Sequence, residues 1–308
     1  MLSRVAERVY WAARYLERAE DSARLVDVHA QLLLDLPRTA GIGWSQVPEI
    51  MGIDIGGIRK GRFAERDILK RLLTDENCAS SVLSSIAMAR ENFRTTRDVV
   101  PTEAWQGVNE LHLFARSELR WAIGQRRRHA ILSDVVARVQ QLRGLLADTM
   151  SHGPAYQFIR LGTNLERADM CTRIIDVAVS GLLRNLEPLQ RFDNTLWMST
   201  LKSVSGYQMY RQYVRRRIRS ADVLTFLFQD EDFPRSLRHC LWQIERCLQR
   251  LPNSSTVAQS LRELTGYLVK MDVGQMDNAD LHAAVDQMQI ELAAMHQRMT
   301  DTWFAPAT

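Results

Sequence analysis

Lysine is scarce in this sequence of 308 residues. Only four of the 40 basic residues are lysine, so the other 36 are arginine. A bias towards arginine codons would explain this composition, and so would selection for the planar, bidentate contacts that arginine makes with carboxylates and phosphates. The formal net charge of +4 is small for a chain of this length. Total charge therefore gives no strong indication of nucleic-acid binding.

Cysteine is also rare, and long apolar runs are absent. The four cysteines, at positions 78, 171, 240 and 247, form no CxxC motif. This usage predicts reduced, buried thiols in a cytoplasmic protein. The sequence has no apolar run of about 18 residues, the length that a membrane-spanning helix needs, so we expect no membrane contact. The amphipathic, charged N-terminal segment does not have the pattern of a secretory signal peptide.

The common catalytic and metal-binding motifs are missing as well. HExxH, the P-loop and GxSxG do not occur in the sequence. A di-iron site in a helical bundle requires histidines three residues after a glutamate, and none of the seven histidines follows an acidic residue at that distance. We therefore predict no metal site and no intrinsic cofactor.

Helical periodicity is what the sequence does contain. Apolar residues recur every three or four positions from Val5 to Leu33, which predicts a first helix from Ser3 to about Leu36. The same criteria predict further helices at about 63–73, 80–99, 101–124, 133–150, 154–187, 195–219, 234–250, 256–271 and 279–300. No segment is a confident strand, so the predicted fold class is all-α.

The segment 38–61 interrupts this helical pattern. Five of the 15 glycines fall between Arg38 and Lys60, so we expect no regular helix in this segment. Apolar residues such as Trp44 and Ile50 stand between the glycines. They indicate a long loop that folds over the body of the protein, as functional lids do.

Two stretches of the sequence occur twice. The tetrapeptide LERA stands at 16–19 and again at 165–168, an offset of 149, and residues 67–77 resemble 222–232 at an offset of 155. We therefore predict an internal duplication, with a first half at 1–150 and a second at 151–308. Each half would hold about five helices, and both would join in one compact helical bundle around a pseudo-twofold axis.

Charged residues repeat together with LERA and are the first candidate site. The candidates are Arg14, Glu17, Arg18, Arg24, Glu166, Arg167 and Arg173. We expect Glu17 to pair with Arg167 or Arg173, and Glu166 with Arg18 or Arg24. One interpretation is a buried, reciprocal ion-pair network that fixes the register of two central helices. The other is a polar cluster in a central cleft, where the arginines hold an anionic ligand and a glutamate acts as a base or orients an arginine.

The second candidate is the basic, aromatic stretch YQMYRQYVRRRIR at 207–219. In the predicted helix its tyrosines share one side, and its arginines are spaced four residues apart. The residues concerned are Tyr207, Tyr210, Tyr213, Arg211, Arg215 and Arg219. They are either a solvent-exposed face or a surface for phosphate, nucleic acid or an acidic partner. We expect the basic residues at 126–129 to form a solvated loop.

The first 28 residues, MLSRVAERVYWAARYLERAEDSARLVDV, resemble the bacterial alpha-E family, a domain of unknown function named for its helical prediction and its Glu-Arg motif. Further matching segments lie at 84–92, 205–211 and 233–241, together with Trp105 and Asn109. The resemblance covers nearly the whole chain. It places the named motif at Glu17-Arg18 and, through the repeat, at Glu166-Arg167.

This resemblance implies a genetic and functional setting without giving a reaction. Members are typically encoded beside a circularly permuted ATP-grasp protein, often together with a transglutaminase-like protein, and are linked to peptide or amide-bond formation or modification. The ATP-grasp partner would bind ATP and magnesium. Our first hypothesis is a helical scaffold or substrate-presenting protein of such a system. The alternatives are an enzyme that uses the Glu-Arg pairs on an anionic peptide, and nucleic-acid binding through 211–219.

Overall fold

The computed structural model describes residues 1–37, 40–55, 64–183 and 192–305, and within these ranges every regular element is a helix. The all-α prediction is confirmed. The helices are α1 (Ser3–Asp35), α2 (Gln46–Met51), α3 (Ala64–Leu73), α4 (Val82–Arg94), α5 (Thr102–Ala122), α6 (Gln125–Thr149), α7 (Pro154–Leu183), α9 (Asp193–Ser203), α10 (Tyr207–Tyr213), α11 (Ser220–Gln229), α12 (Leu237–Leu248), α13 (Ser255–Lys270), α14 (Asn278–Met299) and the π-helical turn η2 (Thr300–Phe304).

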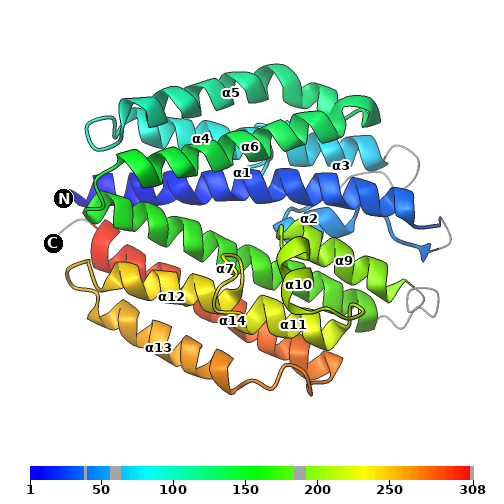
Figure 1. The fold of residues 1–308 in the computed structure, drawn as a ribbon. Helices are drawn as coiled ribbons and strands as arrows, with labels where there is room; N and C mark the ends of the chain where they lie inside the picture. Colours follow the sequence, from blue (N-terminus) through cyan, green and yellow to red (C-terminus); the bar gives the residue numbers. More distant parts are fainter. Residues whose placement is uncertain (38–39, 56–63, 184–191, 306–308) are drawn as a thin grey trace.

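The two longest helices, α1 and α7, pack along each other through the middle of the molecule (Figure 1). Their contacts show that the two helices run parallel, since a later residue of α1 contacts a later residue of α7. Arg14 bonds Glu166, and Glu17 bonds Arg167. Their backbones come unusually close at Gly162, where an added Cβ would lie 2.3 Å from the carbonyl oxygen of Tyr10. A residue without a side chain therefore allows the central contact to form.

The helices pack in the same order around each long helix. In the first half α1 contacts α4 and α6, and α5 covers those two helices. In the second half α7 contacts α12 and α14, and α13 covers them (Figure 1). Two of the equivalent helices also begin in the same way, because Ser81 and Ser236 each accept a hydrogen bond from the backbone N–H three residues later. The internal duplication itself stays a prediction.

Two predicted loops contain helical residues in the described part of the structure. Within the glycine-rich segment, α2 forms and buries Val47 and Ile50, while residues 38–39 and 56–63 lie outside the described part of the chain. The basic segment 126–129 is the first turn of α6, which begins at Gln125 and not near Ser133. Its Arg128 is buried, and its guanidinium donates hydrogen bonds to the carbonyl oxygens of Ala122 and Ile123 at the end of α5. These bonds satisfy carbonyl groups that the end of a helix leaves without partners.

The predicted helix 195–219 is wrong in its middle and at its end. It is split into α9 and α10, because Ser205 has a left-handed backbone with φ 56° between them. Gly206 follows and packs closely against the ring of Phe233. After Tyr213 the chain is no longer helical until α11 begins at Ser220. The arginines of 215–219 therefore do not form the predicted face of a helix.

None of the described helices is long and apolar enough to cross a membrane. The four cysteines are buried free thiols, as predicted. Burial raises the pKa of the Cys240 thiol to about 12 and that of Cys247 to about 11. Thiols with such pKa values stay protonated at neutral pH and are poor nucleophiles.

Candidate functional site

The repeated Glu-Arg motif forms reciprocal ion pairs between the two central helices. Arg167 of α7 donates through Nε to Glu17 at 3.0 Å, and Arg18 of α1 donates to Glu166 at 2.6 Å. These are two of the pairs that the sequence predicted. Arg14 adds a second contact to Glu166, also at 2.6 Å. The motif therefore fixes the register of α1 against α7.

A second layer of charges surrounds Glu17. Arg235, which lies just before α12, contacts Glu17 at 2.7 Å, Glu20 at 2.9 Å and Asp21 at 2.6 Å. Arg143 of α6 bonds both Glu17 and Glu20 through its two terminal nitrogens. Three carboxylates on one face of α1 thus hold arginines from three other parts of the chain. We call this group, with Arg24 and Arg167, the Glu17 cluster.

Arg24 and Arg173 do not make the predicted contacts with the opposite helix. Arg24 stays on its own helix, where it bonds Glu20 and lies 2.9 Å from Asp21. Arg173 likewise bonds Asp169, one turn earlier on α7, at 2.9 Å. Partners three or four residues away on the same helix are within reach without any tertiary contact. Arg24 and Arg173 therefore bond these nearby carboxylates and not the glutamates of the opposite helix.

The carboxylates of the Glu17 cluster are shielded from solvent. The exposed fraction of Glu17 is 1%, of Glu20 0% and of Asp21 2%, and Glu166 is 1% exposed. Burial alone would raise the pKa of Glu17, but Arg167, Arg235 and Arg143 outweigh it and hold that pKa well below its usual range. Burial raises the pKa of Asp21 to about 6 despite the neighbouring Arg235. Glu17 therefore stays ionised, and it is not a proton-transfer group near neutral pH.

Sequence reasoning missed several members of this cluster. Arg143, Arg235 and Glu20 were not candidates, although Glu20 follows directly after the LERA motif. A signal for Arg143 was present, because it stands in an otherwise apolar stripe of α6 between Val139 and Leu146. No sequence pattern could have placed Arg235, since a residue in a loop has no periodicity to give its direction.

The basic stretch 207–219 folds into a hollow of about 540 Å³. It is lined by Tyr207, Arg211, Arg215, Arg216 and Arg217, among others. Arg216 is tied to Asp222 at 2.6 Å. The three tyrosines do not share one side as predicted, because Tyr210 is fully buried against Phe226 whereas Tyr213 is 64% exposed. Arg219 lies outside the lining of the hollow, at the residue before α11.

Comparison with known families decides where this chain belongs. The Alpha-E family, described as a predicted alpha-helical domain with a conserved ER motif, matches residues 1–304. The chain belongs to the Alpha-E family. The repeated Glu-Arg pairs of α1 and α7 remain the sequence prediction for that motif in this Alpha-E protein.

The matching relatives are longer chains of unknown activity. Two proteins, from Mycobacterium bovis and Mycobacterium tuberculosis, are 20% identical to the Alpha-E protein over 320 aligned residues, and both are named as uncharacterized. The alignment covers 97% of this chain but 36% of each relative. The chain therefore spans about a third of their length. No solved structure matches it.

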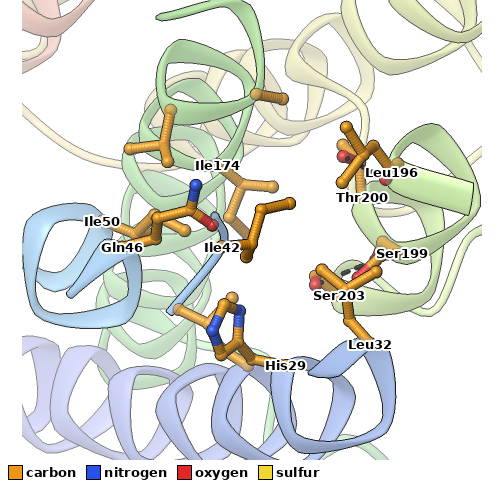
Figure 2. Close-up of a pocket in the computed structure, with 13 residues that line it drawn as sticks. His29, Leu32, Ile42, Gln46, Ile50, Ile174, Leu196, Ser199, Thr200 and Ser203 are labelled. Carbon is orange, nitrogen blue, oxygen red and sulfur yellow. Dashed lines mark hydrogen bonds between the residues drawn. The ribbon is translucent and has the colours of Figure 1, made fainter. Parts of the chain in front are cut away.

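The Alpha-E protein has a small cavity between α1, α2, α7 and α9 (Figure 2). Its volume is about 80 Å³, and its walls include His29 of α1 and Thr200 and Ser203 of α9. The two hydroxyls donate to backbone carbonyls of their own helix, so they are not free nucleophiles. His29 is buried, bonds the carbonyl oxygen of Gly43 at 2.9 Å and packs edge-on against Trp44. It fastens the segment before α2 to α1.

We expect the stability of the protein to fall between pH 7 and pH 5 because of His29. Burial lowers its folded-state pKa from 6.5 to about 4. Because the pKa of His29 is lower in the folded protein, the unfolded chain takes up the proton at a higher pH than the folded protein does. The free energy of unfolding is therefore highest above pH 6.5 and decreases as the pH falls towards 4. The loss at pH 5 is about 2 kcal/mol from this group. Urea unfolding at both pH values, compared with His29→Gln, measures it; an equal loss in the variant would contradict the assignment.

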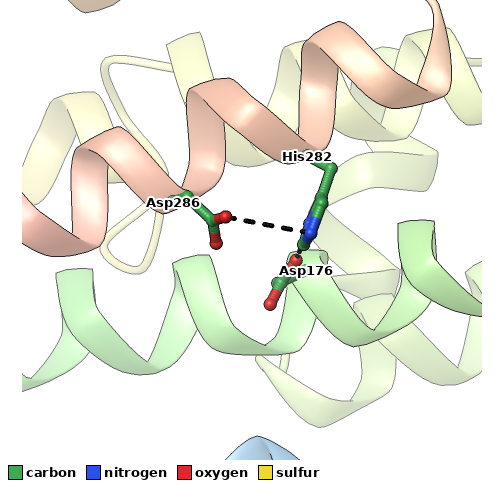
Figure 3. Close-up of side chains that lie close together, drawn as sticks. All are labelled: Asp176, His282 and Asp286. Atoms are coloured by element: carbon green, nitrogen blue, oxygen red, sulfur yellow. Dashed lines mark hydrogen bonds and ion pairs between the residues drawn. The ribbon is translucent and has the colours of Figure 1, made fainter.

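One group of side chains in the described part of the chain has the spacing of metal ligands. It consists of Asp176, His282 and Asp286, between α7 and α14 (Figure 3). The sequence did not anticipate it. Nδ1 of His282 lies 2.6 Å from Asp176, whereas Nε2 lies 3.8 Å from Asp286. Asp27 and His129 form a similar pair between α1 and α6 at 2.9 Å. Such direct pairs join helices by themselves, and we assign them no ion.

Proposed function

We propose that this Alpha-E protein is a helical scaffold or substrate-presenting protein of a peptide or amide-bond ligation system, without a catalytic centre of its own. The observation that carries the proposal is the pairing of the motif. Glu17 and Glu166 are each 1% exposed and are held by arginines from both central helices. A buried, paired carboxylate cannot act as a general base on a substrate that does not reach it. This arrangement supports a structural role for the motif over the enzyme hypothesis.

The relatives support an accessory role. Their chains contain a further two thirds of sequence beyond the part that matches this protein. An Alpha-E unit thus occurs joined to other polypeptide, and the chemistry of the system would lie in that polypeptide or in a separate partner. We infer that the partner is the ATP-grasp protein, which would bring ATP and magnesium, with the transglutaminase-like protein as a second candidate.

The hollow formed by the basic stretch 207–219 is the surface that best fits such a partner. No acidic residue occurs from 194 to 221, a stretch that contains five arginines and Lys202. Tyr213 and Met209 on the same segment are exposed. Tyrosine, methionine and arginine are enriched at protein interfaces, which favours an acidic protein surface over a nucleic acid as the occupant. The break of the predicted helix also removes the continuous basic face that nucleic-acid binding would use.

Co-purification with the proposed ATP-grasp partner tests this proposal. We expect a complex whose affinity falls at least tenfold in Arg215→Glu/Arg217→Glu, since each reversal places like charges across the interface. The matched control is Arg126→Glu/Arg262→Glu, two exposed arginines on α6 and α13. Equal binding by both double variants would contradict the surface. A failure of the protein to associate with the ATP-grasp partner or to change its ligase turnover would contradict the function.

A further inference from the structure

A cleft lies beside the Glu17 cluster, where the end of α6, the first half of α7 and the start of α12 meet. Its volume is about 330 Å³, close to the lower limit for small-molecule pockets. Three arginines line it: Arg143, Arg160 and Arg167. The amides of Asn164 and Gln243 stand among them. We call these five residues the arginine cleft.

The arginine cleft carries positive charge that is not balanced inside the protein. No carboxylate is among the described residues that line it. Behind it, the Glu17 cluster sets four guanidinium groups, of Arg24, Arg143, Arg167 and Arg235, against three carboxylates. One positive charge is therefore in excess, and Arg160, whose contact is with the neutral Gln243, adds a second. A partly enclosed excess of this kind attracts anions.

The buried glutamates hold the arginines of the cleft in place. Glu17 and Glu20 bond the two terminal nitrogens of Arg143, and Arg167 reaches Glu17 through Nε. The side chains of Arg143 and Arg167 are nevertheless 21% and 16% exposed. Each guanidinium has five N–H donors, so donors remain for a ligand. An arginine that is already fixed loses less side-chain entropy on binding.

Comparison of the two halves indicates that the fold does not require this chemistry. With the sequence offsets of 149 and 155, Arg160 corresponds to Trp11, Asn164 to Tyr15, and Gln243 to Met88. Tyr15 and Met88 line a separate cleft of about 450 Å³ in the first half. The three corresponding positions are therefore aromatic or apolar in the first half, and basic or amide in the second. The packing of these helices therefore explains neither the charge of Arg160 nor the amides beside it.

We propose that the arginine cleft binds a small carboxylate ligand of about dipeptide size. Guanidinium forks match a carboxylate. Asn164 donates to the carbonyl of Arg160, and Gln243 contacts Arg160 and His239, so the remaining donor and acceptor positions of the two amides can pair with a peptide group. Ile159 and Leu146 give the cleft an apolar wall that suits an aliphatic stem. The identity of the ligand rests on the proposed function, because a substrate-presenting protein must hold its substrate. The binding itself is tested on this chain alone and needs no partner.

Isothermal titration with N-acetylglutamate and with N-acetylglutamine amide, in which neutral amides replace both carboxylates, tests the ligand class on the unmodified protein. We expect N-acetylglutamate to bind at least tenfold more tightly than the neutral diamide, because the two differ in the carboxylate charges that the arginines would bind. Inorganic phosphate is the third probe. Equal binding of the two acetylated amino acids, no binding of either, or tighter binding of phosphate than of N-acetylglutamate would each overturn the proposal.

The variant Arg160→Gln tests the site. Because Arg160 lies outside the Glu17 cluster, we expect an unchanged thermal midpoint and at least a tenfold weaker binding of N-acetylglutamate. The matched control, Arg262→Gln on α13, should bind as the unmodified protein does, since Arg262 is exposed on the outer layer. A folded Arg160→Gln protein with unchanged affinity would overturn the location. Loss of partner association with intact carboxylate binding would separate a failure of the proposed function from a failure of the cleft.

Discussion

Glu17→Ala is expected to lower the free energy of unfolding by about 3–5 kcal/mol. Its carboxylate is 1% exposed and holds Arg143, Arg167 and Arg235 together. Removing it leaves three guanidinium groups facing one another with fewer negative charges between them. Removing one partner of a buried ion pair costs more stability than the intact pair contributes. The reason is that the desolvation of the remaining charge is then no longer offset. Urea unfolding followed by circular dichroism measures the change.

The control for this prediction is Glu91→Ala on α4. Glu91 also bonds an arginine, Arg94, at 2.6 Å, but the side chains are 53% and 48% exposed. An exposed pair of this kind contributes less than about 1 kcal/mol. If Glu17→Ala and Glu91→Ala lost the same small amount, the Glu17 cluster would not be a buried structural network. The motif would then be free for a direct role in binding or catalysis.

Gly162→Ala is expected to destabilise the protein by about 3 kcal/mol, although alanine is normally the better helix former. The new methyl group would lie 2.3 Å from the carbonyl oxygen of Tyr10 and 3.3 Å from Cβ of Ala13. The obstacle at Tyr10 is backbone, so α1 and α7 would have to move apart. Such a movement would also stretch the reciprocal pairs of Glu17 and Glu166 one turn further along. Thermal unfolding of the variant measures the effect.

Gly144→Ala is the matched control for this substitution. Gly144 stands within α6, and nothing lies within 4 Å of a Cβ added there. The same change should therefore stabilise the protein by up to about 1 kcal/mol through helix propensity alone. A gain in stability at both positions would mean that α1 and α7 are not in backbone contact at Gly162. In that case the register of the Glu-Arg pairs would need another explanation.

Two acidic residues of the central helices, Glu166 on α7 and Asp21 on α1, respond to pH in opposite directions. The pKa of Glu166 is lowered because Arg14 and Arg18 outweigh its burial, so its stabilising contribution is lost as the pH falls below about 4.5. The pKa of Asp21 is raised to about 6, so its ionisation opposes folding as the pH rises through 4 to 6. Asp21 is thus the carboxylate that the cluster holds least well, and one of its oxygens has no hydrogen-bond partner.

Periodic features were predictable from the sequence, and features set by a single residue were not. The long helix of α1 and the reciprocal pairing of Glu17 with Arg167 follow from an apolar stripe and a repeated motif, which are properties of many residues together. The break at Ser205 depends on one left-handed residue, and the early start of α6 depends on Arg128 reaching the end of α5. Such local events change one or two hydrogen bonds and leave the periodic pattern intact.

The sequence alone determined that this protein is all-helical, and it predicted that its two LERA motifs face each other. A helical period repeated over some thirty residues fixes which side of a helix is buried, whatever that side packs against. The tertiary structure alone decided what surrounds the motif. It brought Arg143 of α6 and Arg235 of the loop before α12 to the carboxylates of α1, sealed Glu17 from solvent, and left Arg160 in a neighbouring cleft. Burial and net charge at a point depend on every element that meets there, so neither can be read from one segment.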